Sequence, residues 1–276
     1  MPDIYGSHFE FGGQSSRRYK LILANVTTER LRALAGQIAS DTVFNRKSKQ
    51  RYLINNNYND SPLTLDVDIL TDDDTTLGKT ERRDIKKWLF NRHEYQKFYI
   101  DLADDIGCET FDYIDGERKR LFMFCRFVNP EKLEYNGGIV GYKATLEADS
   151  GYWWQDPIVK TFTLNHSSSS DHTNITLTVD SDIDDYIYPR VVFYTTGTGD
   201  VKITNLTDDS SRTLHFEAVP SGSFIALNSE TSSVTPPFFS KLVNYNFPRL
   251  LDGINTLQIT GAISTIAFQF SNRRML

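Results

Sequence analysis

Hydrophobic and polar residues alternate over long stretches of the first half of the chain, and this pattern predicts β-strands. Within residues 62–70, alternation places two sets of side chains on opposite faces: Leu63, Leu65, Val67 and Ile69 on one, and Thr64, Asp66 and Asp68 on the other. A period of two residues is typical of a strand with one buried face. Residues 96–102 repeat the pattern, and the turn pairs Asp115-Gly116 and Asn136-Gly137 precede further runs of this kind. Two hairpins are therefore predicted.

One segment of the first half has the periodicity of a helix instead. Residues 80–91 place Ile85, Trp88 and Leu89 on one apolar stripe, and Thr80 is the expected N-cap. Acidic residues in the first turn favour the positive end of the helix dipole. We expect this helix to lie across a sheet face.

The second half has the pattern of short strands throughout. Hydrophobic residues alternate with threonine and other polar residues, and clusters of Gly, Asp or Ser separate the runs at intervals of about 10 to 15 residues. Such regular short strands are typical of a β-sandwich of jelly-roll type. The alternating positions are Ile175, Leu177, Val179, Val201, Ile203, Leu214, Phe216, Leu257, Ile259, Ile266, Phe268 and Phe270.

The density of charged residues differs between the two halves of the chain, and the chain is long enough for two domains. Residues 1–160 hold 23 Lys or Arg and 25 Asp or Glu, whereas residues 161–276 hold 7 and 11. The length of 276 residues also exceeds the roughly 100 to 200 usual for one domain. We predict a mainly β protein of two domains. Residues 1–157 form an antiparallel β-sandwich-like domain with one helix, and residues 158–276 form a jelly-roll β-sandwich.

Composition restricts the class of protein. A chain with 39% hydrophobic and 24% charged residues is folded rather than disordered or of low complexity. Its net charge of −6 argues against a sequence-specific nucleic-acid binder, which needs a basic face. No apolar run reaches the roughly 18 residues of a membrane span, so none is predicted. Cys108 and Cys125 are separated by 16 residues, a spacing that fits neither a disulfide scaffold nor a zinc knuckle.

The sequence carries no convincing catalytic, metal-binding or cofactor-binding motif. The five histidines are scattered, and the common hydrolase, phosphate-loop and dinucleotide motifs are missing. The acidic runs 72–74 and 182–185 do not have EF-hand spacing, which favours solvated turns over calcium sites. A glycosidase pair of carboxylates stays open, because its members meet only in space. We predict a protein that is not an enzyme and needs neither metal nor cofactor.

The strongest local positive charge lies in residues 45–51. Because the chain is acidic and only Tyr52 is near enough for base stacking, a salt-bridging contact with an acidic neighbouring subunit is favoured over a contact with phosphate. A solvated loop is the alternative. The basic residues of this segment are Arg46, Lys47, Lys49 and Arg51.

The aromatic cluster Tyr152, Trp153 and Trp154 resembles a sugar platform or an interface anchor by composition. It stands immediately before residues 155–157, at the predicted domain boundary. This position favours a plug that closes the end of the first hydrophobic core.

The order of four motifs resembles that of the distal tail proteins of siphophages. They are KKWLF followed by QKFYIDL, GYKATLEADSGYWWQDP at the end of the first domain, DYIYPRVVF at the start of the second, and NFPRLLDGINTLQITG near the end of the chain. Each is a soft pattern of aromatic, Pro and Gly residues, so the specificity comes from their succession over most of the chain.

The resemblance implies a structural virion protein. Its N-terminal domain would form a hexameric ring at the tail tip, and its C-terminal domain would be a galectin-like β-sandwich. It would be a hub that joins the tail tube to the tip and the host-adhesion apparatus, with DNA passing through its channel, and it would assemble in the bacterial host cytoplasm. The implied partners are further copies, the tail tube protein, tail-tip hub or tape-measure proteins, and a receptor-binding protein or side fibre.

A ring also requires complementary patches on each copy. We expect the basic segment at 46–51 to pair with an acidic run on the neighbouring copy. That run consists of Asp72, Asp73 and Asp74.

A carbohydrate-binding module is the alternative function, and a glycan hydrolase ranks below it. The second half contains no Trp, although exposed aromatic rings usually form sugar platforms. Phe238 and Phe239 follow Pro236-Pro237 as a loop tip would, but burial in the core is the favoured interpretation. The aromatic candidates for glycan or partner binding are Tyr194, Phe238, Phe239 and Tyr245.

Overall fold

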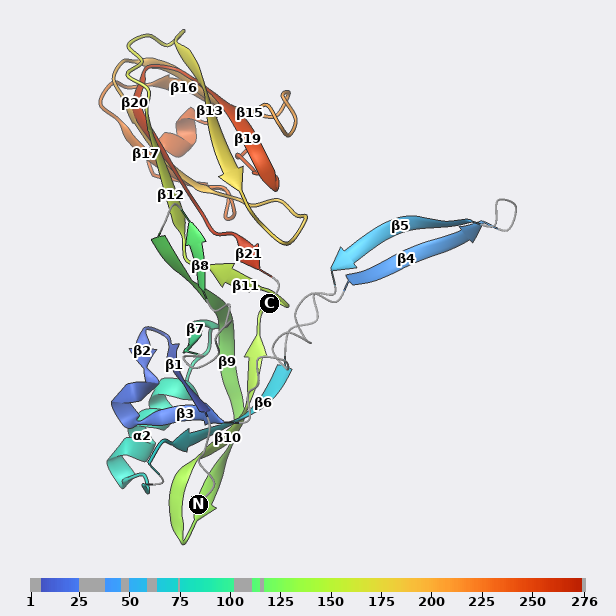
Figure 1. Ribbon diagram of the computed structural model, residues 1–276. Helices are drawn as coiled ribbons and strands as arrows, with labels where there is room; N and C mark the ends of the chain where they lie inside the picture. Colours follow the sequence, from blue (N-terminus) through green and yellow to red (C-terminus); the bar gives the residue numbers. More distant parts are fainter. Residues whose placement is uncertain are drawn as a thin grey trace. The chain divides into compact units, whose positions relative to one another are not determined.

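The computed structural model describes residues 6–24, 38–45, 50–58, 64–73, 75–101, 111–114 and 117–274 (Figure 1). The chain divides into two compact units. The first consists of Met1–Gln155 together with Arg274–Leu276, and the second of Asp156–Arg273. Each is described by itself.

Six antiparallel strands of the first unit close into a barrel. They follow the order β10-β6-β3-β1-β7-β9, and β9 pairs again with β10. The predicted antiparallel β domain is confirmed, with one α-helix among its described residues, and the closure shows that its sheet has no free edge along this path. The six strands are β1 (Gly6–Phe11), β3 (Leu21–Ala24), β6 (Thr64–Thr71), β7 (Gln96–Asp101), β9 (Glu117–Tyr135) and β10 (Gly138–Ala148).

Shorter elements extend the barrel strands. β2 (Gln14–Ser15) pairs with β1, and the 3₁₀ helix η1 (Ser16–Tyr19) follows it. β8 (Phe111–Ile114) and β11 (Trp153–Gln155) both pair with β9. These pairs extend the N-terminal sheet beside β1 and β9.

Both predicted hairpins are present. β8 and β9 pair from Ile114 with Glu117 onward, on either side of residues 115–116, which lie outside the described residues. β9 and β10 are joined by Asn136 and Gly137, whose φ angles are +50° and +79°. Two successive positive φ angles are typical of the type I′ turn, which matches the twist of the flanking strands.

β4 (Ile38–Asn45) and β5 (Gln50–Tyr58) form a separate antiparallel ribbon. Figure 1 shows the two strands side by side, and neither pairs with a third strand in the part of the chain that the structure describes. We call this pair the ribbon. An isolated two-stranded ribbon is marginally stable in water at best.

Helix α2 (Lys79–Leu89) confirms the predicted helix and its apolar stripe. Ile85, Trp88 and Leu89 are buried, which stabilises the packed helix by about 1.5–3 kcal/mol for each side chain. Gly78 rather than Thr80 is the N-cap, because the helix begins at Lys79, two residues earlier than a Thr80 cap implies. The Glu81 carboxylate accepts a 2.8 Å hydrogen bond from the Gly78 amide and so caps the helix.

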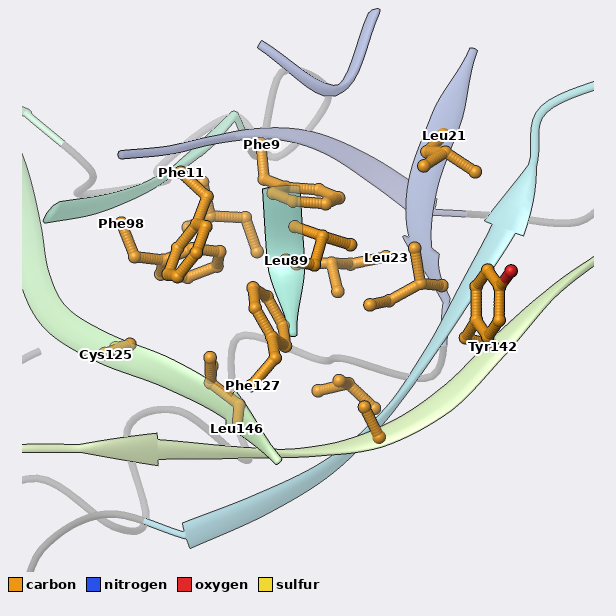
Figure 2. Close-up of a cluster of buried hydrophobic side chains, with 14 of the residues drawn as sticks. Phe9, Phe11, Leu21, Leu23, Leu89, Phe98, Cys125, Phe127, Tyr142 and Leu146 are labelled. Carbon is orange, nitrogen blue, oxygen red and sulfur yellow. The ribbon is translucent and has the colours of Figure 1, made fainter. Parts of the chain in front are cut away.

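The helix packs onto an aromatic core. The Trp88 indole stacks on the Phe9 ring at 5.7 Å and donates a 2.8 Å hydrogen bond to the Phe11 carbonyl oxygen. Figure 2 shows Phe9, Phe11 and Phe127 converging on Leu89 of the helix. Trp153 is fully buried in the same cluster, as expected of a plug for the first core.

The second unit is a sandwich of two antiparallel sheets, which confirms the predicted architecture. One sheet has the order β12-β20-β14-β17-β18 and the other β13-β19-β15-β16. The bounds of the first sheet are β12 (Ile158–Thr163), β14 (Arg190–Thr195), β17 (Phe224–Asn228), β18 (Ser233–Val234) and β20 (Ile263–Phe270). Those of the second are β13 (His172–Val179), β15 (Gly199–Asn205), β16 (Thr213–Val219) and β19 (Gly253–Thr260).

The inward faces of the two sheets form the second core. Phe193 from one sheet meets Phe216 from the other with ring centroids 5.9 Å apart, and both side chains are fully buried. The 3₁₀ helix η2 (Phe238–Lys241) lies beside β16, and the short strand β21 (Arg273–Arg274) ends the described chain. Strand alternation therefore supplies a core between the sheets, with polar residues on the outer faces.

Candidate interaction surfaces

The predicted basic segment connects the two strands of the ribbon. Arg46, Lys47 and Lys49 lie outside the described residues, and Arg51 belongs to β5, where its backbone is opposite Phe44. β4 and β5 therefore flank residues 46–49 in the sequence. Among the described strands, none pairs with either outer edge of the ribbon, and an unpaired strand edge can pair with another chain.

The predicted acidic run follows β6, and its described members contact residues of their own chain. Asp73 forms a 2.7 Å ion pair with Lys20 and accepts a 2.6 Å hydrogen bond from the Thr75 hydroxyl. The Lys20 hydrogen bond, followed by that of Thr75, lowers the pKa of the Asp73 carboxyl to about 2. Asp72 is exposed, with the His8 imidazole 4.0 Å away, and Asp74 lies outside the described residues.

Two of the aromatic candidates lie on the surface around η2. Phe239 and Tyr245 are 51% and 63% exposed, and their rings are 5.9 Å apart. Phe238 is half-buried. The favoured interpretation that Phe238 and Phe239 are buried in the core is therefore wrong, because η2 lies outside the two sheets and buries none of its residues.

Tyr194 belongs to a second exposed aromatic pair that sequence reasoning found only in part. It lies opposite Phe224 in the pairing of β14 with β17, with ring centroids 4.9 Å apart, and both side chains are almost half exposed. Ile225 and Leu227 are buried, so alternation along β17 places Phe224 outward. That alternation was the signal that could have found it.

A basic cluster on α2 was missed altogether. The side chains of Lys79, Arg82, Arg83 and Lys86 line an open hollow together with Lys132 of β9 and Tyr142 of β10. The four helical residues have the spacing i, i+3, i+4 and i+7, which places them on one helix face. That spacing was visible in the sequence, whereas the contribution of Lys132 depends on the fold.

The described residues show no group of three or more side chains that could hold a metal ion. Cys125 is a free, fully buried thiol whose pKa is raised well above its ordinary value by burial, and Cys108 lies outside the described residues. Within the same described part, no helix is long and apolar enough to cross a membrane.

Family models cover almost the whole chain. Residues 4–150 match the model of a phage tail protein N-terminal domain, and residues 158–270 match that of a phage tail C-terminal domain. The chain belongs to this phage tail protein family. As a phage tail protein it is a structural component of the virion, and the resemblance to distal tail proteins seen in the order of motifs is confirmed. A search of curated protein sequences finds no match.

Solved structures share the fold over the whole length of this phage tail protein. The crystal structure of SPP1 Dit (gp 19.1), described as a paradigm of the hub adsorption apparatus in phages that infect Gram-positive bacteria, is 10% identical with a TM-score of 0.62. The match covers 98% of this chain and 100% of that one. A chain of the phage P2 baseplate in its activated conformation with Ca is 9% identical, with a TM-score of 0.55 and coverage of 99% and 100%.

Proposed function

We propose that this phage tail protein is a distal tail protein whose copies close into a hexameric ring. The ring is a hub between the tail tube and the tail tip with its host-adhesion apparatus. The ribbon is the observation that carries this proposal. It pairs with no other described strand of its own chain, so a neighbouring copy is the economical source of the contacts that stabilise it.

The charge distribution supports a closed ring. A ring is built from heterologous interfaces, in which two different patches of each copy meet. The strands of the ribbon flank residues 46–49 of the basic segment, and residues 72–73 of the acidic run follow barrel strand β6. Opposite charges on two separate elements provide such a pair of patches.

Net charge is consistent with a channel for DNA. Each copy carries −6, so six copies carry −36 before screening. An acidic wall repels the phosphate backbone and lacks the counterion-release affinity of a basic channel. The genome would therefore pass through without being held.

The proposed partners follow from the position of a hub. They are further copies of this chain, the tail tube protein, tail-tip hub or tape-measure proteins, and a receptor-binding protein or side fibre. Assembly would take place in the bacterial host cytoplasm before the virion is complete.

Electron microscopy of the purified protein tests the proposal. Class averages should show rings with sixfold symmetry and an axial opening. A field of single protomers at micromolar concentration, or open filaments, would contradict a closed hub.

The exposed aromatic pairs favour a second candidate function, a carbohydrate-binding module that contributes to host attachment. Phe239 with Tyr245, and Tyr194 with Phe224, each present two neighbouring rings to solvent, as a sugar platform requires.

A glycan array tests this second function. Binding that is lost in Phe239→Ala/Tyr245→Ala or in Tyr194→Ala/Phe224→Ala would support it. Tyr135→Ala is the matched control, because Tyr135 is 52% exposed and lies in the first unit. No binding by the parent protein, or equal binding by every variant, would reject it.

A further inference from the structure

The hollow on α2 concentrates positive charge in an acidic protein. Lys79, Arg83, Lys86 and Lys132 are exposed, and Arg82 is half-buried. None of these five basic residues forms an ion pair with another described residue. Like charges gathered around one hollow repel one another, so a negatively charged ligand would relieve this repulsion.

Besides Lys132, the barrel contributes Tyr142 to the hollow. The Tyr142 hydroxyl is buried and has no hydrogen-bond partner among the described residues. Tyr142 is only 1% exposed, and its Oη has no hydrogen-bond partner within the described structure. Figure 2 shows the Tyr142 ring at the edge of the core cluster, with its oxygen pointing away from Phe127. A buried hydroxyl without a partner costs about 1–3 kcal/mol, so a ligand that accepts its hydrogen bond would recover that cost.

Burial keeps the Tyr142 hydroxyl in its donor form. Burial raises the pKa of the Tyr142 phenol above its ordinary value, and the Arg82 charge only partly offsets this. The phenol is therefore protonated at neutral pH and donates its hydrogen. The Lys86 ammonium lies 5.9 Å from the centroid of the same ring, and both residues line the hollow.

We propose that this hollow is a binding pocket for the carboxylates of an acidic protein segment. A carboxylate accepts several charge-assisted hydrogen bonds at once, so it can bind Lys and Arg side chains and the Tyr142 hydroxyl together. A single side chain from a flexible segment can enter a hollow, whereas the phosphates of duplex DNA lie on a convex surface. Duplex DNA is also repelled by the net charge of −6 over its length, while a short acidic segment responds to charge within about 8 Å.

The pocket is tested with the full-length protein and two labelled probes of similar charge, hexa-aspartate and a short DNA duplex. Fluorescence anisotropy at low salt should show hexa-aspartate binding, and the affinity should fall as salt rises. Lys86→Glu/Lys132→Glu should weaken binding at least tenfold. Lys143→Glu is the matched control, because Lys143 is exposed on β10 and does not line the hollow; its affinity should change less than twofold.

Tyr142→Phe distinguishes an effect on ligand binding from an effect on protein stability. It removes the hydroxyl without a partner and leaves the ring in the core, so the melting temperature should not fall while hexa-aspartate affinity drops severalfold. Unchanged affinity in both the Tyr142 and the Lys86/Lys132 variants, or an equal loss in Lys143→Glu, would overturn the pocket. Tighter binding of the duplex with the same dependence on these residues would overturn it in favour of a nucleic-acid site.

The source of the acidic segment is decided by the assembly state of Lys86→Glu/Lys132→Glu. If the segment belongs to a neighbouring copy, this variant loses both peptide binding and self-association. If it belongs to another tail protein, peptide binding is lost while self-association is unchanged. The peptide measurement does not depend on ring formation, so the failure of the proposed hub and the failure of the pocket are distinguishable.

Discussion

Single residues fix the close contacts on which both units depend. Gly141 on β10 faces β6, and a Cβ atom added there would collide with the Ile69 carbonyl oxygen. In the second unit, Asn255 is fully buried and binds both its own turn and Asn205 of β15. Glycine and asparagine are common residue types, so the sequence alone does not mark these two positions. The need for Gly141 and Asn255 follows from the neighbouring strands β6 and β15.

Gly141→Ala should destabilise the barrel by about 3 kcal/mol, because the added methyl group must displace β6. All three tryptophans, Trp88, Trp153 and Trp154, belong to the first unit, so tryptophan fluorescence during urea unfolding reports on it. Gly137→Ala is the control. Its Cβ meets open space and it is strained only by a positive φ, so it should cost about 1 kcal/mol. Equal losses would contradict the proposed collision.

Asn255→Ala should destabilise the second unit by about 3 kcal/mol, because it breaks several buried hydrogen bonds. The Asn255 side chain accepts from the Leu251 amide at 2.9 Å and donates to the Leu251 carbonyl oxygen at 2.7 Å. Circular dichroism melting measures the loss. Asn174→Ala, on the exposed face of β13, should stay within about 0.5 kcal/mol of the parent protein; a similar loss in both would contradict the role of this network.

The ion pair of Asp73 should be visible in an acid titration. The lowered pKa means that Asp73 stabilises the fold above its ordinary value of 3.8, and that this contribution is lost as pH falls toward about 2. Carboxyl NMR shifts should show Lys20→Met raising the pKa of Asp73 toward 3.8. Thr75→Val should raise it less, since its hydrogen bond is the smaller cause. The reverse order would show that Lys20 is not the main partner.

At the scale of elements, periodicity predicted faces but not neighbours. The alternation in residues 64–71 and 96–101 and the apolar stripe of α2 were all recognisable in the sequence. Closure of the barrel was not, because β9 pairs with β7 near its middle and with β10 toward its end. Alternation says which side of a strand is buried and nothing about which strands lie beside it.

For the candidate surfaces too, the sequence predicts which residues share a face of one element but not which other elements lie beside it. The charges of α2 could be predicted from their spacing along one helix, whereas Lys132 and Tyr142 join them only because β9 and β10 fold back beside the helix. Phe239 was predicted to be buried from its hydrophobicity. Its exposure is set by η2, which lies outside the two sheets.

At the scale of elements, the prediction concerns the basic segment of the ribbon. Reversing the charge of Arg46, Lys47 and Lys49 to Glu should weaken self-association, with the larger effect at low salt. Adding Asp72→Lys should restore part of it, because the opposite charges are then exchanged. Analytical ultracentrifugation compares the variants, with Lys160→Glu in the second unit as the control. Unchanged assembly of the triple variant at low salt would discard the pairing.

At the scale of the whole molecule, the two units differ in the surfaces that they offer for contact. The first combines a closed barrel with a ribbon that has no described partner, and the second is a sandwich with exposed aromatic pairs. A closed barrel offers no edge for further strands along its six-membered path, so within the first unit the ribbon offers strand edges for contact with another chain. The family match over both units agrees with a protein built for assembly.

The mass of the intact protein in solution tests the central claim most directly. Native mass spectrometry at near-physiological salt should show a species of six or twelve times the 31.6 kDa subunit. On dilution, the ring should dissociate to single subunits without a series of oligomers of intermediate size, because a closed ring has no free ends. A stable single subunit at micromolar concentration, or a continuous series of open oligomers, would contradict the hub.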